Sequence, residues 1–210
     1  MAVMAVIAVL LSVAAVGIQN IDRGQATTSA AAVTEALFDE ARSAAVGRGT
    51  RARLLIHNDL NDGDPEDRAR FLTFMCVAVL TSDAEGNPGG QWEVITRGTS
   101  LPNGVYFSEK ESEEVASKIN VGKFGRMSIA LPGDSRQAKQ CIYYEFNSEG
   151  VCVDSDSNGA APGAAVVLIG GARLRDEEEP RLRGNNKVGF VIWRNGRTSL
   201  FRNPEQIDNP

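Results

Sequence analysis

The sequence predicts an α+β protein, in which a long N-terminal α-helix packs on an antiparallel, β-rich head. Three observations lead to this prediction. Residues 1–18 contain no charged side chain. The pattern then becomes amphipathic and stops at Gly47 and Gly49, which are natural helix terminators. From Arg51 onward, short apolar runs alternate with polar turns, as in antiparallel sheets.

We expect three parts along the chain. Residues 1–24 form an apolar helix suited to a membrane or to the core of a bundle, residues 25–50 continue it in amphipathic form, and residues 51–210 form the globular head. The 210 residues, 42% hydrophobic and 23% charged, fit one domain with an appendage. The 22 basic and 27 acidic residues argue against general nucleic-acid binding, which requires a basic surface.

The uncharged N-terminal run has the length of a marginal membrane span. As a helix it would be about 27 Å long, close to the bilayer hydrocarbon core of about 30 Å. A secretory signal peptide is one alternative, but no basic residue precedes Arg23. A helix buried on all sides is another. The positions expected to insert into a membrane or to pack in an assembly are Ala5, Ala8, Leu10, Leu11, Val13, Val16 and Gly17.

The amphipathic part continues the same helical pattern. Its apolar positions at helical spacing are Val33, Leu37, Ala41, Ala44 and Ala45. The simplest interpretation is one helix over residues 1–46, with Gly17 and Gly24 as soft points. The alternative is two helices with a break near residues 22–24.

The head is predicted to be mostly strands. The strand-like segments are 51–57, 71–80, 91–96, 105–107, 126–131, 140–146, 151–153, 165–169, 188–193 and 198–202. Asn195 and Gly196, between the last two segments, form a strong hairpin signal. A short helix is predicted within residues 108–119. The segments expected to be long polar loops are 58–67, 82–90, 154–163 and 176–186.

One of these loops has the opening of a calcium-binding sequence. Asp154, Asp156 and Asn158 occupy alternate positions before Gly159, which supplies oxygen ligands and a sharp turn. Ala165 stands where a complete EF-hand has its bidentate acid, so a complete EF-hand is excluded. A calcium site would need a distant carboxylate, and a solvated polar loop is the alternative.

The cysteines do not predict a disulfide framework. A four-residue loop over residues 147–150 would place Glu145 opposite Cys152 and leave Cys141 about 13 Å away. A disulfide needs Cα atoms within about 7 Å. Cys76 lies in the most apolar run and is expected to be a buried thiol.

No catalytic motif is found, and we expect no enzyme. The chain contains one histidine, His57, and no G-x-S-x-G, H-E-x-x-H or phosphate-loop sequence. His57 ends a predicted strand, where a capped or solvated side chain is expected. No cofactor is expected other than calcium at the loop described above.

Four stretches, in order along the chain, resemble the type IV pilin-like proteins, and most closely the H-type minor pseudopilins (GspH/FimT-like). They are the apolar run MAVMAVIAVLLSVAAVGI, the helix exit ALFDEARSAAVGRGTRARLLI, the turn LPNGVYF and the terminal hairpin. The family's processing glycine and the glutamate at its fifth mature position have no counterpart here, where residue 5 is Ala5. Alignment of the apolar runs places Met1 just after that glutamate and the apolar residue that follows it.

The resemblance implies a structural subunit of a type IV pilus or type II secretion-type filament. Such a subunit is anchored in the inner membrane by a single span, and then joins a periplasmic or extracellular filament. Its partners would be other pilin-like subunits and, before assembly, the inner membrane; nucleic acid is not expected among them. The alternative is a membrane-anchored extracytoplasmic binding module, with calcium as a candidate stabilising ion, that does not polymerise.

Overall fold

The computed structural model describes the backbone of residues 2–60, 64–82, 88–155, 159–173, 180–194, 198–201 and 206. Within these ranges it describes every side chain except those of residues 2–23, 82, 88–89, 134–136 and 183–185.

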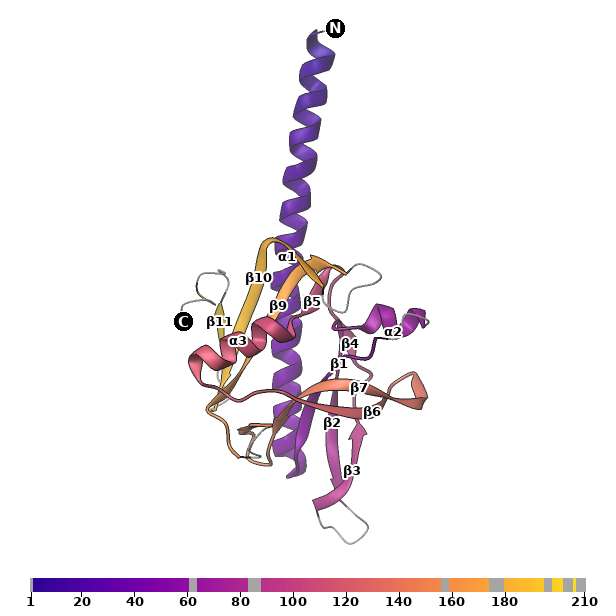
Figure 1. Cartoon of the computed structure of the whole chain (residues 1–210), viewed down its shortest axis with the longest axis vertical. Coiled ribbons are helices and arrows are strands. Elements are labelled where there is room, and N and C mark those ends of the chain that lie inside the picture. Colours follow the sequence, from indigo (N-terminus) through magenta and orange to yellow (C-terminus); the bar gives the residue numbers. More distant parts are fainter. Residues whose placement is uncertain are drawn as a thin grey trace.

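A single helix, α1 (Ala2–Arg48), runs through the molecule. Its 47 residues give a length of about 70 Å. Figure 1 shows that its C-terminal half lies against the strands while its N-terminal half projects beyond them. The prediction of one helix is confirmed, and the alternative with a break near residues 22–24 is wrong. α1 ends at Arg48, and the next residue, Gly49, leaves the helical region with a φ of 62°.

The strands form two antiparallel sheets. The first sheet has the order β3 (Pro88–Val94), β2 (Phe74–Ser82), β1 (Ala52–His57), β7 (Asp134–Phe146) and β6 (Gly125–Leu131), with β4 (Thr99–Ser100) on β2 and β8 (Cys152–Val153) on β7. The second sheet has the order β11 (Thr198–Phe201), β10 (Arg181–Trp193), β9 (Gly163–Ala172) and β5 (Val105–Phe107). Two short helices complete the head, namely α2 (Pro65–Arg70) and α3 (Glu109–Ile119). The predicted fold class, an N-terminal helix on an antiparallel β-rich head, is therefore observed.

α1 joins the two sheets through one shared core. It packs against β1, β2 and β7 of the first sheet and against β5, β9 and β10 of the second. Phe38, which is 1% exposed, makes edge contacts with Tyr144 and Phe146 of the first sheet at ring-centroid distances of 5.2 and 6.2 Å. It makes a third edge contact, at 5.8 Å, with Phe190 of the second sheet. The helix therefore contributes a central side chain to the core that the two sheets share.

The second sheet is covered on both faces. α3 packs on the side away from α1, where Val115 and Ala116 meet Val167 and Ile169 of β9. β9 is buried over its first eight residues because helices cover both of its faces. The Ser112 hydroxyl accepts a hydrogen bond from the Val167 N–H at 2.9 Å, which fixes α3 on the sheet.

The first sheet is curved toward its outer face, which is the face directed away from α1. Leu55, Cys76 and Cys141 point away from α1 and are at most 1% exposed. The two edge strands, β3 and β6, contact each other. This face therefore has a small core of its own, closed by the curvature of the sheet.

The head departs from the sequence predictions at the ends of several elements. Residues 82–90 are not all loop, because β2 runs to Ser82 and β3 begins at Pro88. Residues 58–67 are not all loop, because Asp64 caps α2 by accepting a hydrogen bond from the Glu66 N–H at 2.8 Å, with Pro65 in the first turn. Residues 176–186 are not all loop either, because β10 begins at Arg181 and pairs with β9 at Ala172. Pairing with a neighbouring strand overrides the polar composition there.

The hairpin between β7 and β8 has a different register from the predicted one. Phe146 pairs with Cys152, and Glu145 pairs with Val153 instead of Cys152. The Asn147 side chain accepts hydrogen bonds from the N–H groups of Glu149 and Val151, at 3.1 and 2.9 Å. Val151 is thereby held in the loop, which becomes one residue longer.

The glycine predicted as a soft point supplies a test of α1. Gly24 lies inside α1, and a Cβ atom added there meets nothing within 4 Å. We expect Gly24→Ala to raise the free energy of unfolding by about 0.5–1 kcal/mol, because alanine loses less backbone entropy in a helix. Thermal unfolding followed by circular dichroism measures the change. Gly163→Ala is the control, since its Cβ would lie 2.3 Å from the Ile192 carbonyl oxygen and should lower stability; equal effects from both variants would contradict the prediction.

Candidate functional site

The described half of α1 has one buried face and one open face. The buried positions are Thr27, Ala30, Ala31, Thr34, Leu37, Phe38, Ala41 and Ala45. Val33 and Ala44 are partly buried against the same core, so the predicted apolar face is confirmed. The open positions are Gln25, Thr28, Ser29, Ala32, Ala36, Asp39, Glu40, Ser43, Val46, Gly47 and Arg48. Most of these side chains are small, so a second helix can approach this face closely.

The predicted insertion and assembly positions lie in the projecting half of α1. They are Ala5, Ala8, Leu10, Leu11, Val13, Val16 and Gly17, whose backbone is helical and whose side chains are outside the described residues. Among the described residues, no helix is both long enough and apolar enough to cross a membrane.

Polar contacts fasten α1 to the head near the C-terminus and in the middle of the packed half. Near the helix C-terminus, the Arg42 Nε–H donates a hydrogen bond to the Gly150 carbonyl oxygen at 3.1 Å. Further toward the projecting half, the Thr198 hydroxyl of β11 donates a hydrogen bond to the Glu35 carboxylate. Together with the ring contacts of Phe38, these bonds make the helix and head one body.

The predicted calcium loop is described only in part. Asp154 is half-buried, and its carboxylate accepts a hydrogen bond from the Lys123 N–H at 3.1 Å. Asp156 and Asn158 lie outside the described residues. The described residues contain no group of three or more His, Cys, Asp or Glu side chains placed to hold a metal. Calcium binding at this loop stays a prediction.

A cavity of about 450 Å³ opens between the end of β1, the N-terminus of α3 and the second sheet. Its apolar lining includes Leu60, Phe71, Leu72, Phe107 and Ile169, and its polar lining includes Asn58, Ser108, Glu109 and Lys110. Leu72 has a φ of 54°, which is strained for a branched side chain. Its N–H donates to the His57 carbonyl oxygen, and its own carbonyl oxygen accepts from the Phe107 N–H, both at 2.8 Å. The strained residue thereby connects the two sheets beside an apolar cavity.

A buried ionisable cluster lies beside this cavity. It consists of His57 at the end of β1, Asp67 in α2 and Lys139 in β7, which are 1%, 3% and 4% exposed. Lys139 Nζ donates a hydrogen bond to Asp67 Oδ2 at 2.7 Å, and His57 Nε2 lies 3.5 Å from Asp67 Oδ1. The expectation that His57 is capped or solvated is wrong, because α2 and β7 cover it, and neither ring nitrogen has a hydrogen-bond partner among the described residues.

Burial lowers the pKa of His57 below its ordinary value of 6.5. The loss of water around the ring is the largest cause, because it disfavours the imidazolium. The carboxylates of Asp67 and Asp59 oppose this shift, and the nearby cations Arg70 and Lys139 add to it.

This shift predicts acid sensitivity of the fold. Below pH 6.5 the unfolded chain binds a proton at its single histidine while the folded chain does not, so stability falls with falling pH until the lowered folded pKa is reached. His57→Leu should remove this component of the pH dependence. Thermal unfolding between about pH 7.5 and 5 measures it for both proteins. Identical profiles for the two proteins in that range would contradict the prediction.

All three cysteines are buried and free. Burial raises the pKa of Cys76 and of Cys152 to about 12, and it raises the pKa of Cys141 as well. Such thiols stay protonated and unreactive at neutral pH. The prediction of Cys76 as a buried thiol is confirmed.

Sequence reasoning missed Asp67 and Lys139. Asp67 lies in a segment predicted as loop, although Asp64 and Pro65 are a readable helix start that places it in a first turn. Lys139 precedes the predicted strand and becomes buried only because β7 begins five residues before it. Pairing with β6 causes that extension, and no local signal indicates it.

The comparisons with known proteins give one structural likeness. No family model and no curated protein sequence matches this chain. Among solved structures, the chain is similar to the minor pseudopilin EpsH from the type 2 secretion system of Vibrio cholerae, with 12% sequence identity and a TM-score of 0.41. The similarity covers 84% of this chain and 96% of that chain.

Proposed function

We propose that this chain is a pilin-like structural subunit of a type IV pilus or type II secretion-type filament. One observation carries the proposal. A continuous helix is packed on the head over its C-terminal half and projects over its N-terminal half, and the projecting half begins with 18 uncharged residues (Figure 1). An apolar helix free of its own head needs an apolar environment from elsewhere.

A membrane supplies that environment before assembly, and the helices of other subunits supply it afterwards. Transfer of the helix from lipid to a bundle of subunit helices changes the hydrophobic free energy little, because both environments are apolar and exclude water. Close packing then decides the equilibrium. The small side chains in the N-terminal run and on the open face of α1 permit that packing.

Head contacts between neighbouring subunits would complete the filament. A helix that leaves its own head can dock only on other subunits, so the contact is heterologous and builds an open assembly. The anchor places the subunit in the inner membrane at first, and the head outside the cytoplasm. The proposed partners are other pilin-like subunits, of the same or of a different chain.

Membrane fractionation and electron microscopy test this proposal. Leu11→Lys places a charge inside the uncharged run, which costs about 3 kcal/mol for insertion. We expect this variant to leave the membrane fraction and to be absent from filaments sheared off cells. Ser128→Lys, on the exposed side of β6, is the matched control and should behave as the wild type. Wild-type chain found only as a membrane-bound monomer, with no filament, would contradict the proposal.

The cavity beside Leu72 favours a second candidate function, a membrane-anchored binding module that does not polymerise. An apolar cavity with a few polar groups at its rim is typical of small-ligand sites. Saturating binding of an apolar probe to the head, together with a strictly monomeric membrane-bound state, would favour this candidate over the filament subunit.

A further inference from the structure

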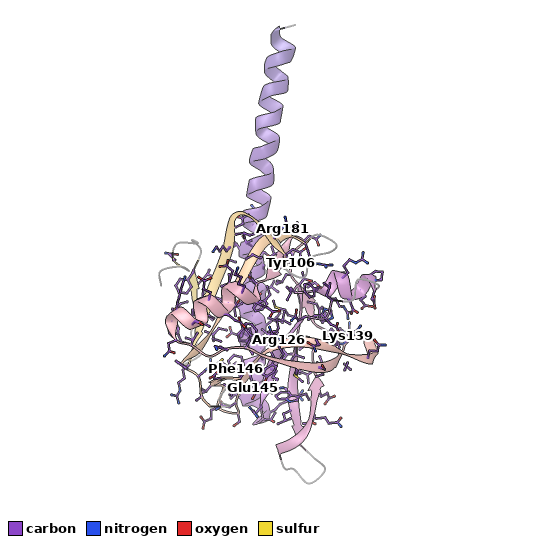
Figure 2. The ribbon with its side chains drawn as sticks, viewed as in Figure 1. Tyr106, Arg126, Lys139, Glu145, Phe146 and Arg181 are labelled. Carbon is purple, nitrogen blue, oxygen red and sulfur yellow. The ribbon has the colours of Figure 1, made fainter. Side chains whose placement is uncertain are left out.

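The cluster of His57, Asp67 and Lys139 holds an amine against a carboxyl group in a buried site. The three side chains come from β1, α2 and β7, and each residue is at least 96% buried. Figure 2 shows Lys139 toward the end of the first sheet that carries α2, well apart from Glu145 on the same strand. An ion pair buried in this way loses the hydration of both charges, which offsets much of its attraction.

Lysine is nucleophilic only as the neutral amine, so its ammonium proton must be removed before it can attack a carboxyl carbon. Transfer of one proton from the Lys139 ammonium to the Asp67 carboxylate gives an amine and a carboxylic acid, and no charge remains to be hydrated. Nζ lies 2.7 Å from Oδ2, so the carboxyl carbon Cγ is one bond beyond the contact atom. Groups held this close react with the effective concentration of an intramolecular reaction.

We propose that Lys139 and Asp67 condense to an intramolecular isopeptide bond. The Nζ lone pair of Lys139 attacks Cγ of Asp67 and forms the N–C bond. One C–O bond of the carboxyl group then breaks, and that oxygen leaves as water. An ammonium and a carboxylate thus become one amide and one water molecule, with no change in oxidation state and no further reactant.

His57 is placed to move the protons of this step. Its Nε2 atom lies 3.5 Å from Asp67 Oδ1, whereas Lys139 Nζ contacts Oδ2. A neutral imidazole accepts a proton from the attacking nitrogen and returns it to the leaving oxygen. Burial lowers the pKa of His57 and keeps this ring neutral at neutral pH.

Two other lysine–carboxylate pairs among the described residues are more exposed to solvent. Lys187 pairs with Glu111 at 3.0 Å, but the side chains are 14% and 27% exposed. Lys118 pairs with Glu114 in the open, at 38% and 52% exposure. Water hydrates the charged forms in both pairs, so condensation is not expected there.

The bond would attach α2 covalently to the first sheet. It would close a chain loop from residue 67 to residue 139, which includes β2, β3, β4, β5, α3 and β6. Closing so long a loop restricts the unfolded chain and raises resistance to unfolding. This consequence holds whether or not the subunit polymerises.

Mass spectrometry of the full chain, purified under native conditions and then denatured, tests the proposal. We expect the wild type to be lighter than its sequence mass by one water molecule. After digestion, a branched peptide should join the Lys139 and Asp67 segments. Wild-type chain at its full sequence mass after prolonged incubation would overturn the proposal. So would a loss of water located elsewhere, for instance as a succinimide at Asp62.

Three variants distinguish loss of the cross-linking reaction from loss of folding. Lys139→Arg keeps the cation but has no nucleophilic amine, and it should restore the full sequence mass. His57→Gln should lower the fraction of cross-linked chain at early times. Lys187→Arg is the matched control and should keep the mass loss. The mass of the wild-type chain tests the proposal by itself. The test therefore remains valid even if a variant fails to fold.

Discussion

Phe38→Ala is expected to lower the free energy of unfolding by about 3–5 kcal/mol, the range for removing a large aromatic side chain from a core. Phe38 is 1% exposed and contacts rings from both sheets. The cavity left behind would lie where α1, the first sheet and the second sheet meet, so none of the three can close it alone. The substitution therefore removes the side chain on which the common core is centred.

Denaturant unfolding of the full chain, followed by the fluorescence of Trp92 and Trp193, measures this loss. Val46→Ala on the same helix is the control, because Val46 is 51% exposed and its truncation should cost less than about 0.5 kcal/mol. A loss for Phe38→Ala below about 1 kcal/mol would show that the sheets hold together without the helix side chain.

Glu145→Gln is expected to cost about 3 kcal/mol, because it removes one partner of a buried ion pair. Glu145 is 3% exposed and pairs with Arg53 of β1 and with Arg51, which precedes that strand. The guanidinium of Arg53 lies between the rings of Trp92 and Tyr143, with its central carbon 3.9 and 3.8 Å from their centroids. Without the carboxylate, this nearly buried cation keeps the ring faces and the Met127 sulfur, which do not neutralise its charge.

Equilibrium unfolding of a matched variant distinguishes the effect of burying an ion pair on stability from the effect of pairing itself. Glu109 pairs with Arg126 at 2.5 Å, but the side chains are 23% and 56% exposed. Glu109→Gln should therefore cost less than about 1 kcal/mol, since solvent screens the pair. Equal losses for Glu109→Gln and Glu145→Gln would contradict the claim that burial sets the cost.

The packing of α1 on the head also bears on the proposed filament. A projecting helix transmits force to its head only if the packed half stays in place. Phe38 and Arg42 hold that half on the strands. A variant that loosens them should lose filament incorporation before it loses membrane association, because the projecting half is unchanged.

Local patterns predicted the elements whose boundaries local chemistry decides. The strand Val105–Phe107 was predicted with its observed bounds, because the preceding turn at Pro102 and Gly104 stops the chain before it. The helix over residues 108–119 was predicted because its charged pattern is local, and Ser108 caps it. α1 was predicted as one helix, since Gly24 lowers helix propensity without breaking the hydrogen-bond ladder.

Elements that depend on a distant partner were predicted less well. β10 begins earlier than its apolar run because Arg181 pairs with Ala172 of β9. The hairpin at Asn147 is one residue longer than predicted because a side chain holds the backbone of Val151. In both cases the contact that sets the boundary cannot be recognised from hydrophobic periodicity or amino-acid composition.

The sequence by itself determined the long helix, the β-rich head and the uncharged N-terminal run, because helix period, turn residues and charge are local properties of the chain. Only the tertiary structure decided that His57, Asp67 and Lys139 share one buried site. They are separated by as many as 82 positions and lie in a strand end, a capped helix and an extended strand. Their proximity follows from sheet register and from the packing of α2, and long-range pairing of this kind depends on the whole fold.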